Sequence, residues 1–328
     1  MNALVTGATG FIGSVLVRDL LARGSSVRAL VLPGENADVL KKQGVRVIRG
    51  DLTDPESLRG VCEGIETVFH LAGRVTDWGT KRQFYTAICD ATGNLLQEAA
   101  GRASRFVYVS SIAAMGMGRH LKGVKESDPP RKSGVSYNDA KVDAEALVRA
   151  FHREDKMKCT IVRPANVVGP GSVWVRDIAD RMMSATGVPL IDGGRYSASF
   201  VYVDHLVDGM ILAAAGDIAC GKAYHFRDDW RVNWKEYITD LGSWIGKRPR
   251  GSIPFRLAWM TGFVLEAVLN PLHIRAPLTR LSAGVLGRDN DVDTTLARTE
   301  LGWRTRLSYP EAMEKIGAWV KDHYQIGR

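Results

Sequence analysis

The sequence predicts an α/β fold, built as a doubly wound parallel sheet with a smaller C-terminal lobe. In the first half of the 328 residues, short apolar runs of strand length alternate with stretches of helical character. The runs are apolar throughout, which is typical of strands that are covered by helices on both faces. Right-handed crossovers between such strands give a parallel sheet. The second half loses this regularity and is rich in tryptophan and proline, which indicates a smaller lobe.

The expected elements follow one another closely along the chain. Strands are expected at 3–7, 27–32, 45–52, 67–73, 105–111 and 159–169, and helices near 11–23, 35–43, 55–63, 81–102 and from about 136 onward. Residues 1–165 would form the sheet unit. Residues 166–328 would form mainly the second lobe, with part of 198–225 returning to the sheet unit.

Composition argues against several classes of protein. With 45% hydrophobic residues, the chain can bury a sizeable core. The cysteines lie far apart, so we expect reduced thiols rather than a metal site or a redox motif. The N-terminus runs from a strand straight into a turn and leaves no room for a signal segment, so we expect a cytoplasmic protein.

The charge pattern narrows the range of partners. The formal charge of +8 is scattered without a block of basic residues, so we expect no nucleic-acid partner. The most apolar stretch, residues 253–272, contains Arg256 and Glu266, which disfavours a membrane-spanning helix. We expect a buried or interfacial amphipathic helix there, and peripheral contact with a membrane stays open.

The first chemical signal is the stretch TGATGFIG, which places Gly7, Gly10 and Gly13 after a strand and at the start of a helix. Glycines permit a tight turn, close approach of the backbone to a ligand and close packing of helix on strand. The N–H groups and the dipole of the helix then face an anion such as a pyrophosphate. This context predicts a Rossmann-type dinucleotide site.

Two further segments would line the same cleft. Asp51, in GDLTD, ends the third strand, where its carboxylate could contact an adenine amino group or cap the next helix. The sequence leaves both roles open. The stretch HLAG at 70–73 ends the fourth strand at the carboxyl edge of the sheet, where ligands bind in such folds.

The stretch VSYNDAK places Tyr137 and Lys141 four positions apart at the start of a helix. This spacing brings both side chains to one face, but it is also common on solvated helices. The spacing alone therefore does not distinguish a catalytic pair from a solvated stripe.

The motifs TGATGFIG, GDLTD, HLAG, FVYVSSIAAMG, YNDAK and VRPANVVGPG, in this order, resemble those of the extended short-chain dehydrogenase/reductase family, in the NAD-dependent epimerase/dehydratase superfamily. The resemblance covers nearly the whole chain. It implies a catalytic triad of Ser111, Tyr137 and Lys141. Ser110 is the nearest rival for the serine, and Ser111 is preferred because Gly116 then fits the family spacing.

The resemblance also implies a role for each member of the triad. A free tyrosine has a pKa of about 10, and we expect the Lys141 ammonium and the nicotinamide ring to favour the phenolate of Tyr137 as acid/base catalyst. Lys141 would also hold the nicotinamide ribose, and Ser111 would stabilise charge on the substrate oxygen. The implied cofactor contacts are Gly7, Thr9, Gly10, Phe11, Ile12, Gly13, Asp51, Leu52, Leu71, Ala72, Gly73, Tyr137, Lys141, Pro164, Asn166 and Val167.

The chain departs from the family pattern at two places, and the second departure concerns the choice of cofactor. Ile88 stands where the family usually has an asparagine on the helix before the serine strand. The second strand ends at Val31 and Leu32, without an acidic residue for a ribose hydroxyl or an arginine for a 2′-phosphate. The cofactor is therefore NAD or NADP, with NAD favoured because a missing arginine should penalise the phosphate more.

The substrate side lacks a feature of relatives that act on nucleotide sugars. Ala198 stands where those relatives carry an arginine for the diphosphate, although Arg195 or Arg176 could replace it. Apolar material for a pocket is supplied by Trp78, Trp174 and residues 253–286. Packing between the two lobes would also explain the two tryptophans. The closest similarity is to the 3β-hydroxysteroid or sterol dehydrogenase branch, which implies a small apolar substrate.

Several alternatives stay open. A nucleotide-sugar epimerase or dehydratase is the second enzyme hypothesis, and a non-catalytic dinucleotide sensor or scaffold is the hypothesis from another class. Asp77 would contact substrate or cap its loop, whereas His70, His205 and Asp204 are interpreted as structural. No metal-ligand cluster is expected. The oligomeric state is not determined by the sequence, and a homodimer is one option.

Overall fold

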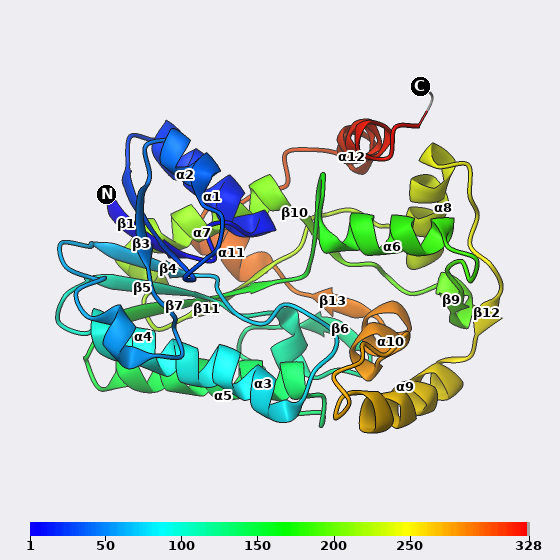
Figure 1. Cartoon of the computed structure of the whole chain (residues 1–328), viewed down its shortest axis with the longest axis horizontal. Helices are drawn as coiled ribbons and strands as arrows, with labels where there is room; N and C mark the ends of the chain where they lie inside the picture. The colour runs from blue at the N-terminus through cyan, green and yellow to red at the C-terminus, as the bar shows by residue number, and fades with distance from the viewer. Residues whose placement is uncertain (327–328) are drawn as a thin grey trace.

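The centre of the molecule is a sheet of seven parallel strands (Figure 1) in the computed structural model, which describes residues 1–326. The strands are β1 (Asn2–Thr6), β2 (Ser26–Val31), β3 (Arg46–Arg49), β4 (Thr67–His70), β5 (Arg105–Val109), β7 (Lys158–Pro164) and β11 (Ala223–Phe226). Their order is β11-β7-β5-β4-β1-β2-β3, so the chain winds outward from β1 to one edge and then from β4 to the other. This order confirms the predicted doubly wound fold.

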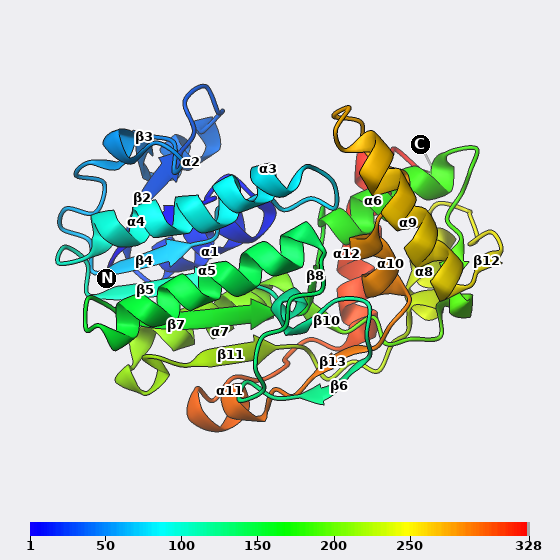
Figure 2. The same cartoon turned by 90° about the horizontal axis from the view of Figure 1, so that it is seen from below.

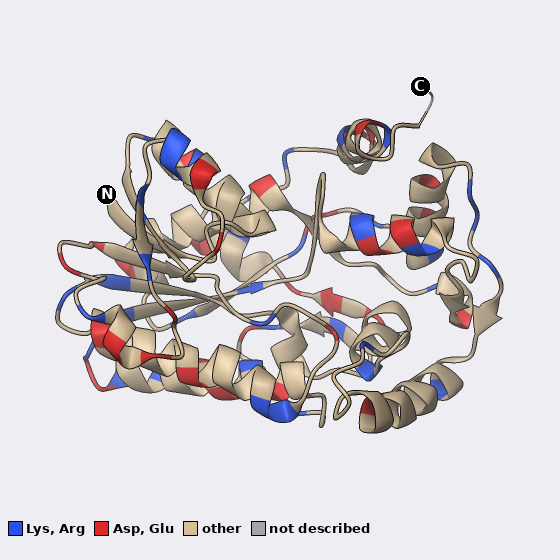
Figure 3. Ribbon diagram, viewed as in Figure 1, with Lys and Arg blue, Asp and Glu red and all other residues tan. Residues whose placement is uncertain are grey.

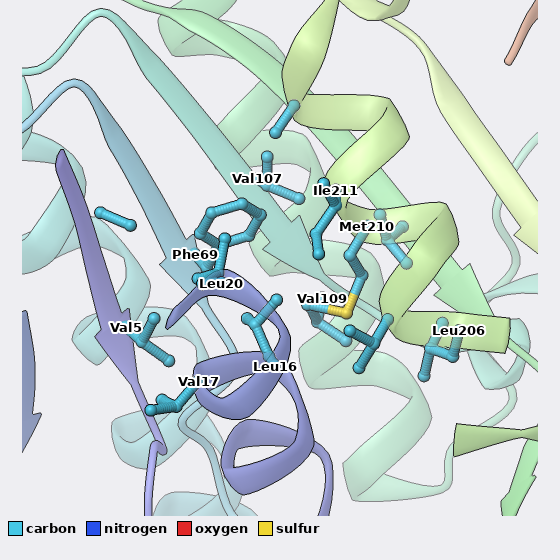
Figure 4. Packing of buried hydrophobic residues seen from close by; sticks show 14 of the residues in the cluster. Val5, Leu16, Val17, Leu20, Phe69, Val107, Val109, Leu206, Met210 and Ile211 are labelled. Atoms are coloured by element: carbon cyan, nitrogen blue, oxygen red, sulfur yellow. The ribbon is translucent and has the colours of Figure 1, made fainter. Parts of the chain in front are cut away.

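Helices cover both faces of the sheet (Figure 1), which explains why its strands are apolar throughout. Successive side chains of a strand point to opposite faces, so each strand supplies two cores. Val5 and Phe69 belong to the core under α1 (Phe11–Ala22) and α7 (Val203–Ala215), which Figure 4 shows. Their neighbours Leu4 and Val68 belong to the opposite core, and the helices over that face are α3 (Lys81–Tyr85), α4 (Ala91–Ala99) and α5 (Ser136–Arg153).

Local details differ from the sequence prediction in three places. The helix expected near 55–63 is only a 3₁₀ turn, Pro55–Leu58, because Gly60 and Gly64 adopt positive φ angles and end the helical path. The helix expected near 35–43 is limited to α2 (Asp38–Lys42). The long helix expected near 81–102 contains a π-helical segment, Thr86–Asp90, between α3 and α4.

The second lobe packs beside the carboxyl ends of the strands (Figure 2). Its core contains large aromatic side chains, among them Phe200, Trp230, Trp234 and Tyr237. No helix within residues 1–326 is long and apolar enough to cross a membrane. The helices around this lobe are α6 (Val173–Met183), α8 (Trp234–Trp244), α9 (Phe255–Leu269), α10 (Arg280–Leu286) and α12 (Tyr309–His323), and α11 (Thr295–Glu300) contacts β11.

Short parallel strand pairs connect the outer segments. They are β8 (Asn166–Val168) with β10 (Phe200–Tyr202), β9 (Leu190–Ile191) with β12 (Ser252–Ile253), and β6 (Leu121–Val124) with β13 (Asn290–Val292). The elements α7 and β11 belong to the central sheet unit, although they follow the first part of the lobe in sequence.

Candidate active site

The turn between β1 and α1 distinguishes the three glycines of the motif. A Cβ at Gly13 would lie 2.0 Å from the carbonyl oxygen of Gly7, so this position must stay glycine for helix and strand to pack. Gly7 has a φ of +69°, and a Cβ there would lie 3.0 Å from the amide nitrogen of Ala72. Gly10 is exposed, and the nearest atom to its Cβ position is 3.2 Å away. Gly7 and Gly13 therefore hold the turn together, whereas Gly10 keeps its outer side open.

The N-terminus of α1 is suited to an anion. Gly10 is the N-cap residue, no side chain caps the helix, and its first turn contains no acidic residue. The free N–H groups and the positive end of the helix dipole favour a phosphate at this point. The turn also lies where the strand order reverses, between β1 and β4, which is the ligand crevice of doubly wound sheets. These features fit the pyrophosphate of a dinucleotide.

A buried hydrogen-bond network fixes the end of β4 beside this turn. The Thr6 hydroxyl contacts His70 Nδ1 at 2.8 Å, and the Thr92 hydroxyl contacts its Nε2 at 3.0 Å. The amide of Ala72 donates to the same Thr6 oxygen at 3.1 Å. Burial lowers the pKa of His70 to about 3, so the ring is neutral at physiological pH. His70 thus positions the Leu71, Ala72 and Gly73 backbone at the edge of the cleft.

The structure corrects the interpretation of the end of β2, because an acidic residue does lie there. The Thr9 hydroxyl donates to the carboxylate of Glu35, and the Leu32 amide donates to its Oε2 at 3.2 Å. Residues 32–35 form a turn in which the Glu35 amide donates to the Leu32 carbonyl and Gly34 has a φ of +82°. This turn brings Glu35 back over the strand end beside the glycine turn. The Pro33–Gly34 pair, a strong turn signal, was the clue that could have identified it.

Asp51 does not cap the following helical turn. Its carboxylate accepts hydrogen bonds from the amide and the hydroxyl of Thr53, both at 2.8 Å. The cap is Asp54, which accepts from the Glu56 amide at 3.1 Å. The neighbouring carbonyl of Leu52 accepts from Asn94 Nδ2 at 2.9 Å. Asp51 therefore remains free of the capping role, and its contact with adenine stays a prediction.

The predicted triad lies at the carboxyl end of β5. Tyr137 is partly buried, and burial raises the pKa of its hydroxyl, while a hydrogen bond with Ser111 lowers it. Lys141 is buried one turn further along α5, and its Nζ donates to the Val109 carbonyl at 2.8 Å. The net rise in the pKa of Tyr137 is opposite to the lowering expected from a neighbouring ammonium. The reason is that burial outweighs the hydrogen bond with Ser111.

The two serines of this segment have different partners. The Ser110 hydroxyl is buried and donates to Glu145 at 2.7 Å. The Ser111 oxygen accepts from the Ala113 amide at 3.1 Å at the start of a 3₁₀ turn, and the side chain meets Tyr137. The Ser110 hydroxyl is thus hydrogen-bonded within the protein interior. This leaves Ser111 as the serine beside Tyr137.

A buried ion pair lies behind Lys141. Glu145, four residues further along α5, accepts two hydrogen bonds from Arg163, at 2.8 and 2.6 Å, and both side chains are fully buried. Burial lowers the pKa of Lys141 to about 8, and the Glu145 carboxylate opposes this shift. Sequence reasoning did not identify Glu145, although its spacing from Lys141 placed it on the same helix face.

The residues after β7 border the cleft from the other side. Pro164 ends β7, and Asn166 and Val167 lie in β8. The amide of Asn166 donates to the Ala198 carbonyl at 2.7 Å, so this side chain joins β8 to β10. The ring of Phe11 lies close to Gly169, at 3.2 Å from the Cβ position there. The glycine turn and the segment after β7 are therefore direct neighbours.

A small cavity of about 20 Å³ adjoins Tyr137. Neither Trp78 nor Trp174 lines it. The Trp78 ring lies against Arg74, and Trp174 packs on Trp234 with ring centroids 5.2 Å apart. The structure thus places Trp174, partly buried, against the core of the lobe. Residues predicted near the substrate do line the cavity, namely Asp77 and, from the segment 253–286, Glu266, Asn270 and Leu281. Sequence reasoning did not identify the other lining residues, Gly79, Phe84, Val135 and Ser136.

The positions considered for a diphosphate anchor do not supply a cation to this cavity. Ala198 is fully buried. Arg195 is exposed, and its guanidinium donates to the Tyr196 hydroxyl at 2.9 Å and lies 3.9 Å from Asp192. Arg176 is exposed on α6. Neither arginine is among the residues that line the cavity beside Tyr137.

Comparison with known proteins agrees with this geometry. The model of the NAD dependent epimerase/dehydratase family matches residues 3–225. The chain belongs to this family. The glycine turn that fits a pyrophosphate lies in the matched region. Together with the relatives named as reductases and dehydrogenases, the family supports an NAD(P)-dependent oxidoreductase that acts on CH–OH groups.

Relatives of this family member include enzymes with named activities. The chain is 31% identical over 322 residues to 4-hydroxy-2-methyl-3-oxo-4-farnesyl-3,4-dihydroquinoline-1-oxide ketoreductase of Stigmatella aurantiaca, covering 96% of each chain. It is 32% identical to 3 beta-hydroxysteroid dehydrogenase/Delta 5→4-isomerase of Mycobacterium tuberculosis, covering 95% of this chain and 88% of the relative. The UDP-glucuronic acid 4-epimerase of Bacillus cereus, solved with UDP-glucuronic acid and NAD, shares the fold, with a TM-score of 0.77, 21% identity and 99% and 100% coverage.

Proposed function

We propose that this oxidoreductase transfers a hydride between NAD and the hydroxyl or carbonyl carbon of an apolar, lipid-like alcohol or ketone. A 3β-hydroxysteroid or sterol-like compound is the first candidate class. The observation that carries the proposal is the hydrogen bond from Lys141 Nζ to the Val109 carbonyl at 2.8 Å. It holds the start of α5, which carries Tyr137, against the carboxyl end of β5, where Ser111 begins the next turn.

The protein's own groups have distinct roles in the reductive direction. Tyr137 donates its proton to the substrate carbonyl oxygen, and the Ser111 hydroxyl stabilises the charge that develops on that oxygen. Lys141, held by the Val109 carbonyl, supplies positive charge near the phenolate that Tyr137 becomes. When bound, the nicotinamide supplies the hydride to the carbonyl carbon. The oxidative direction reverses each step.

The cavity lining is mixed, and its charged groups are paired. Phe84, Val135 and Leu281 contribute apolar surface beside Tyr137, whereas Ser136 and Asn270 are polar. The carboxylates of Asp77 and Glu266 pair with Arg275 and Arg280, at 3.1 and 2.7 Å, so the lining offers no free cation to a diphosphate. A nucleotide diphosphate left without a cationic partner in such a site would be costly to desolvate. The names of the two relatives above, which contain a farnesyl group and a steroid, agree with this chemistry. The likeness to the nucleotide-sugar epimerase concerns the fold alone.

Glu35 supports NAD over NADP. Its carboxylate lies beside the glycine turn, where it can accept a hydrogen bond from a ribose hydroxyl and would repel a 2′-phosphate. Arg49 also brings a positive charge to this turn, where its Nη1 donates to the backbone carbonyls of Leu32 and Glu35, at 2.8 and 2.5 Å. The preference for NAD therefore rests on the Glu35 carboxylate, which is the group that contacts Thr9 in the glycine turn.

A direct assay tests the proposal. Purified protein is given NADH or NADPH with a panel of sterol-like and prenylated ketones, and in parallel with UDP-glucose and UDP-galactose. We expect NADH-dependent reduction of an apolar ketone and no detectable binding of either nucleotide sugar. Micromolar binding of a UDP-sugar, without binding of any apolar ketone or 3β-hydroxysterol, would overturn the proposal in favour of an epimerase.

A further inference from the structure

We propose that α9 docks the protein on an anionic lipid bilayer and that the apolar substrate enters the site from that bilayer. The second half of this statement rests on the proposed function, whereas the first half does not. The observation that prompts it is the outer face of α9 and of the turn that follows.

The outer face of α9 is unusually apolar for an exposed surface. Fifteen large hydrophobic side chains are exposed in the described chain, and seven of them lie between residues 257 and 274. Each of the seven is between 49% and 62% exposed. The spacing of three or four residues along the helix places several of them in one stripe. These seven, which we call the α9 face, are Leu257, Met260, Phe263, Val264, Val268, Leu272 and Ile274.

The inner side of the helix is firmly packed, so the α9 face is a fixed part of the surface. A Cβ at Gly262 would lie 2.8 Å from the carbonyl carbon of Thr279, which shows how closely α9 approaches the start of α10. Glu266 accepts hydrogen bonds from the Arg280 backbone and guanidinium, at 2.5 and 2.8 Å. Figure 1 shows α9 at the periphery of the second lobe, in keeping with the exposure of the α9 face. Contiguous exposed apolar surface of this kind marks an interaction site.

The charge around the α9 face fits an anionic surface. Between residues 245 and 275 the only carboxylate is Glu266, which is paired with Arg280. Lys247, Arg248 and Arg256 are exposed and form no ion pair within residues 1–326. Figure 3 shows basic residues at the start of α9 and along the segment that leads to it. An apolar helical face with basic neighbours is typical of helices that lie in the interface of an anionic membrane.

A second copy of the chain fits this surface less well. A two-fold contact brings the same patch of both subunits together, and because this stretch of chain carries no unpaired carboxylate, its basic residues would gain no acidic partner from the second copy. A membrane-spanning arrangement is also disfavoured, since α9 has 15 residues and no helix of the described chain is both long and apolar enough to span a bilayer. An anionic bilayer satisfies both the apolar face and the basic neighbours.

The same helix forms part of the wall of the site. Glu266 and Asn270 line the cavity beside Tyr137. Asn270 accepts a hydrogen bond from the Gly79 amide at 3.3 Å. Arg275 joins Asp77 at 3.1 Å to Asp177 at 2.8 Å, so the segment after α9 also holds the loop after β4. A substrate that leaves the bilayer beside α9 would thus reach the cavity without crossing bulk water.

Vesicle binding tests the docking step without cofactor or substrate. The purified full chain is centrifuged with phosphatidylcholine vesicles, or with vesicles that contain about one-third phosphatidylglycerol. We expect at least about tenfold stronger binding to the anionic vesicles, weakened at about 0.5 M salt because the charges are screened. The double variant Met260→Glu/Val264→Glu should lose at least about tenfold in binding, because it puts charge into the apolar face.

Matched controls separate this surface from hydrophobicity in general. Leu147→Glu and Ile218→Glu change exposed apolar residues far from α9 and should leave vesicle binding unchanged. Absence of binding to anionic vesicles by the wild-type chain overturns docking. Docking is also overturned if the wild-type chain is a dimer, the double variant is a monomer, and neither of them binds vesicles.

Turnover distinguishes the two proposals. A wild-type chain that reduces a dispersed apolar ketone without binding vesicles would overturn docking and leave the proposed function intact. A chain that binds vesicles through the α9 face but reduces no apolar ketone would overturn the proposed function alone. If the substrate enters from the bilayer, the double variant should lose activity on a vesicle-embedded ketone and keep activity on a short water-soluble ketone. Equal activity of wild type and variant on the embedded ketone would contradict substrate entry from the bilayer.

Discussion

At the scale of single residues, the site depends on charges that the protein holds away from water. Lys141 is buried, and its ammonium is supported by the Val109 carbonyl and by the nearby Glu145 carboxylate. Glu145 is in turn held by two hydrogen bonds from Arg163. Glu35 brings a second carboxylate to the opposite end of the cleft. Each of these groups leads to a prediction.

The buried lysine predicts a fall in reductive turnover as pH rises through about 8, because the pKa of Lys141 is lowered to about 8 and the charged form is needed. The Glu145 carboxylate raises this pKa, so Glu145→Gln should move the midpoint of the fall to lower pH. The measurement is kcat against pH, with each variant normalised to its own maximum. Glu154→Gln, an exposed change just beyond α5, is the control. A midpoint in Glu145→Gln that is unchanged or higher would refute the role given to Glu145.

The carboxylate beside the glycine turn predicts cofactor preference. Glu35→Gln removes the charge that repels a 2′-phosphate, so the preference for NAD over NADP should fall by about tenfold, equivalent to about 1.4 kcal/mol. Calorimetric titration with both dinucleotides measures it. Glu56→Gln, an exposed change in the 3₁₀ turn after β3, should leave the preference as it is. If Glu35→Gln also leaves the preference for NAD unchanged, Glu35 does not contact the ribose of the bound cofactor.

At the scale of elements, the turn from β1 to α1 is where the pyrophosphate of the cofactor is expected to bind. The sequence motif does not distinguish the three glycines from one another, but their packing does. Gly13 has the Gly7 carbonyl oxygen against it, whereas Gly10 has backbone angles, φ −76° and ψ 173°, that other residues adopt readily. The two positions should therefore respond differently to the same substitution.

Gly10→Val should weaken NAD binding by at least about tenfold while changing unfolding free energy by less than about 1 kcal/mol, since its side chain would enter space open to a pyrophosphate. Gly13→Val should instead destabilise the fold by about 1–3 kcal/mol or more, because its side chain collides with backbone. Calorimetric titration and urea unfolding measure the two effects. Equal loss of stability in both variants would show that the turn has no open side at Gly10.

At the scale of the whole molecule, the features predicted correctly from the sequence are those determined by residues close together in the chain. Apolar runs and the glycine motif gave the parallel sheet and its ligand edge, because strand burial and turn chemistry are encoded within a few residues. The same rules failed at the helix expected near 55–63, where Gly60 and Gly64 were given too little weight. They also overlooked Glu35, although the Pro33–Gly34 turn that positions it is local.

The lining of the cavity was predicted only in part. The apolar character of residues 253–286 indicated a pocket wall, and Glu266, Asn270 and Leu281 do line the cavity. Which residues face them, about two hundred residues away at Asp77 and Gly79, is encoded by no periodicity. For the same reason Trp174 was a weak candidate, because its packing against the lobe core depends on Trp234. The sheet unit and the second lobe meet at one side chain, Tyr137, which lies beside both Phe84 and Leu281 in the cavity.

The most direct measurement is therefore the turnover of Tyr137→Phe with an apolar ketone under conditions in which chemistry limits the rate. Removing one hydroxyl deletes the proton donor and leaves the ring against Phe84, so NAD affinity and stability should stay close to wild type. Proton transfer contributes about 10² to 10⁴-fold, so kcat should fall by that range. A variant that binds NAD normally and keeps more than about a tenth of the wild-type kcat would contradict the assignment of Tyr137 as the acid/base catalyst.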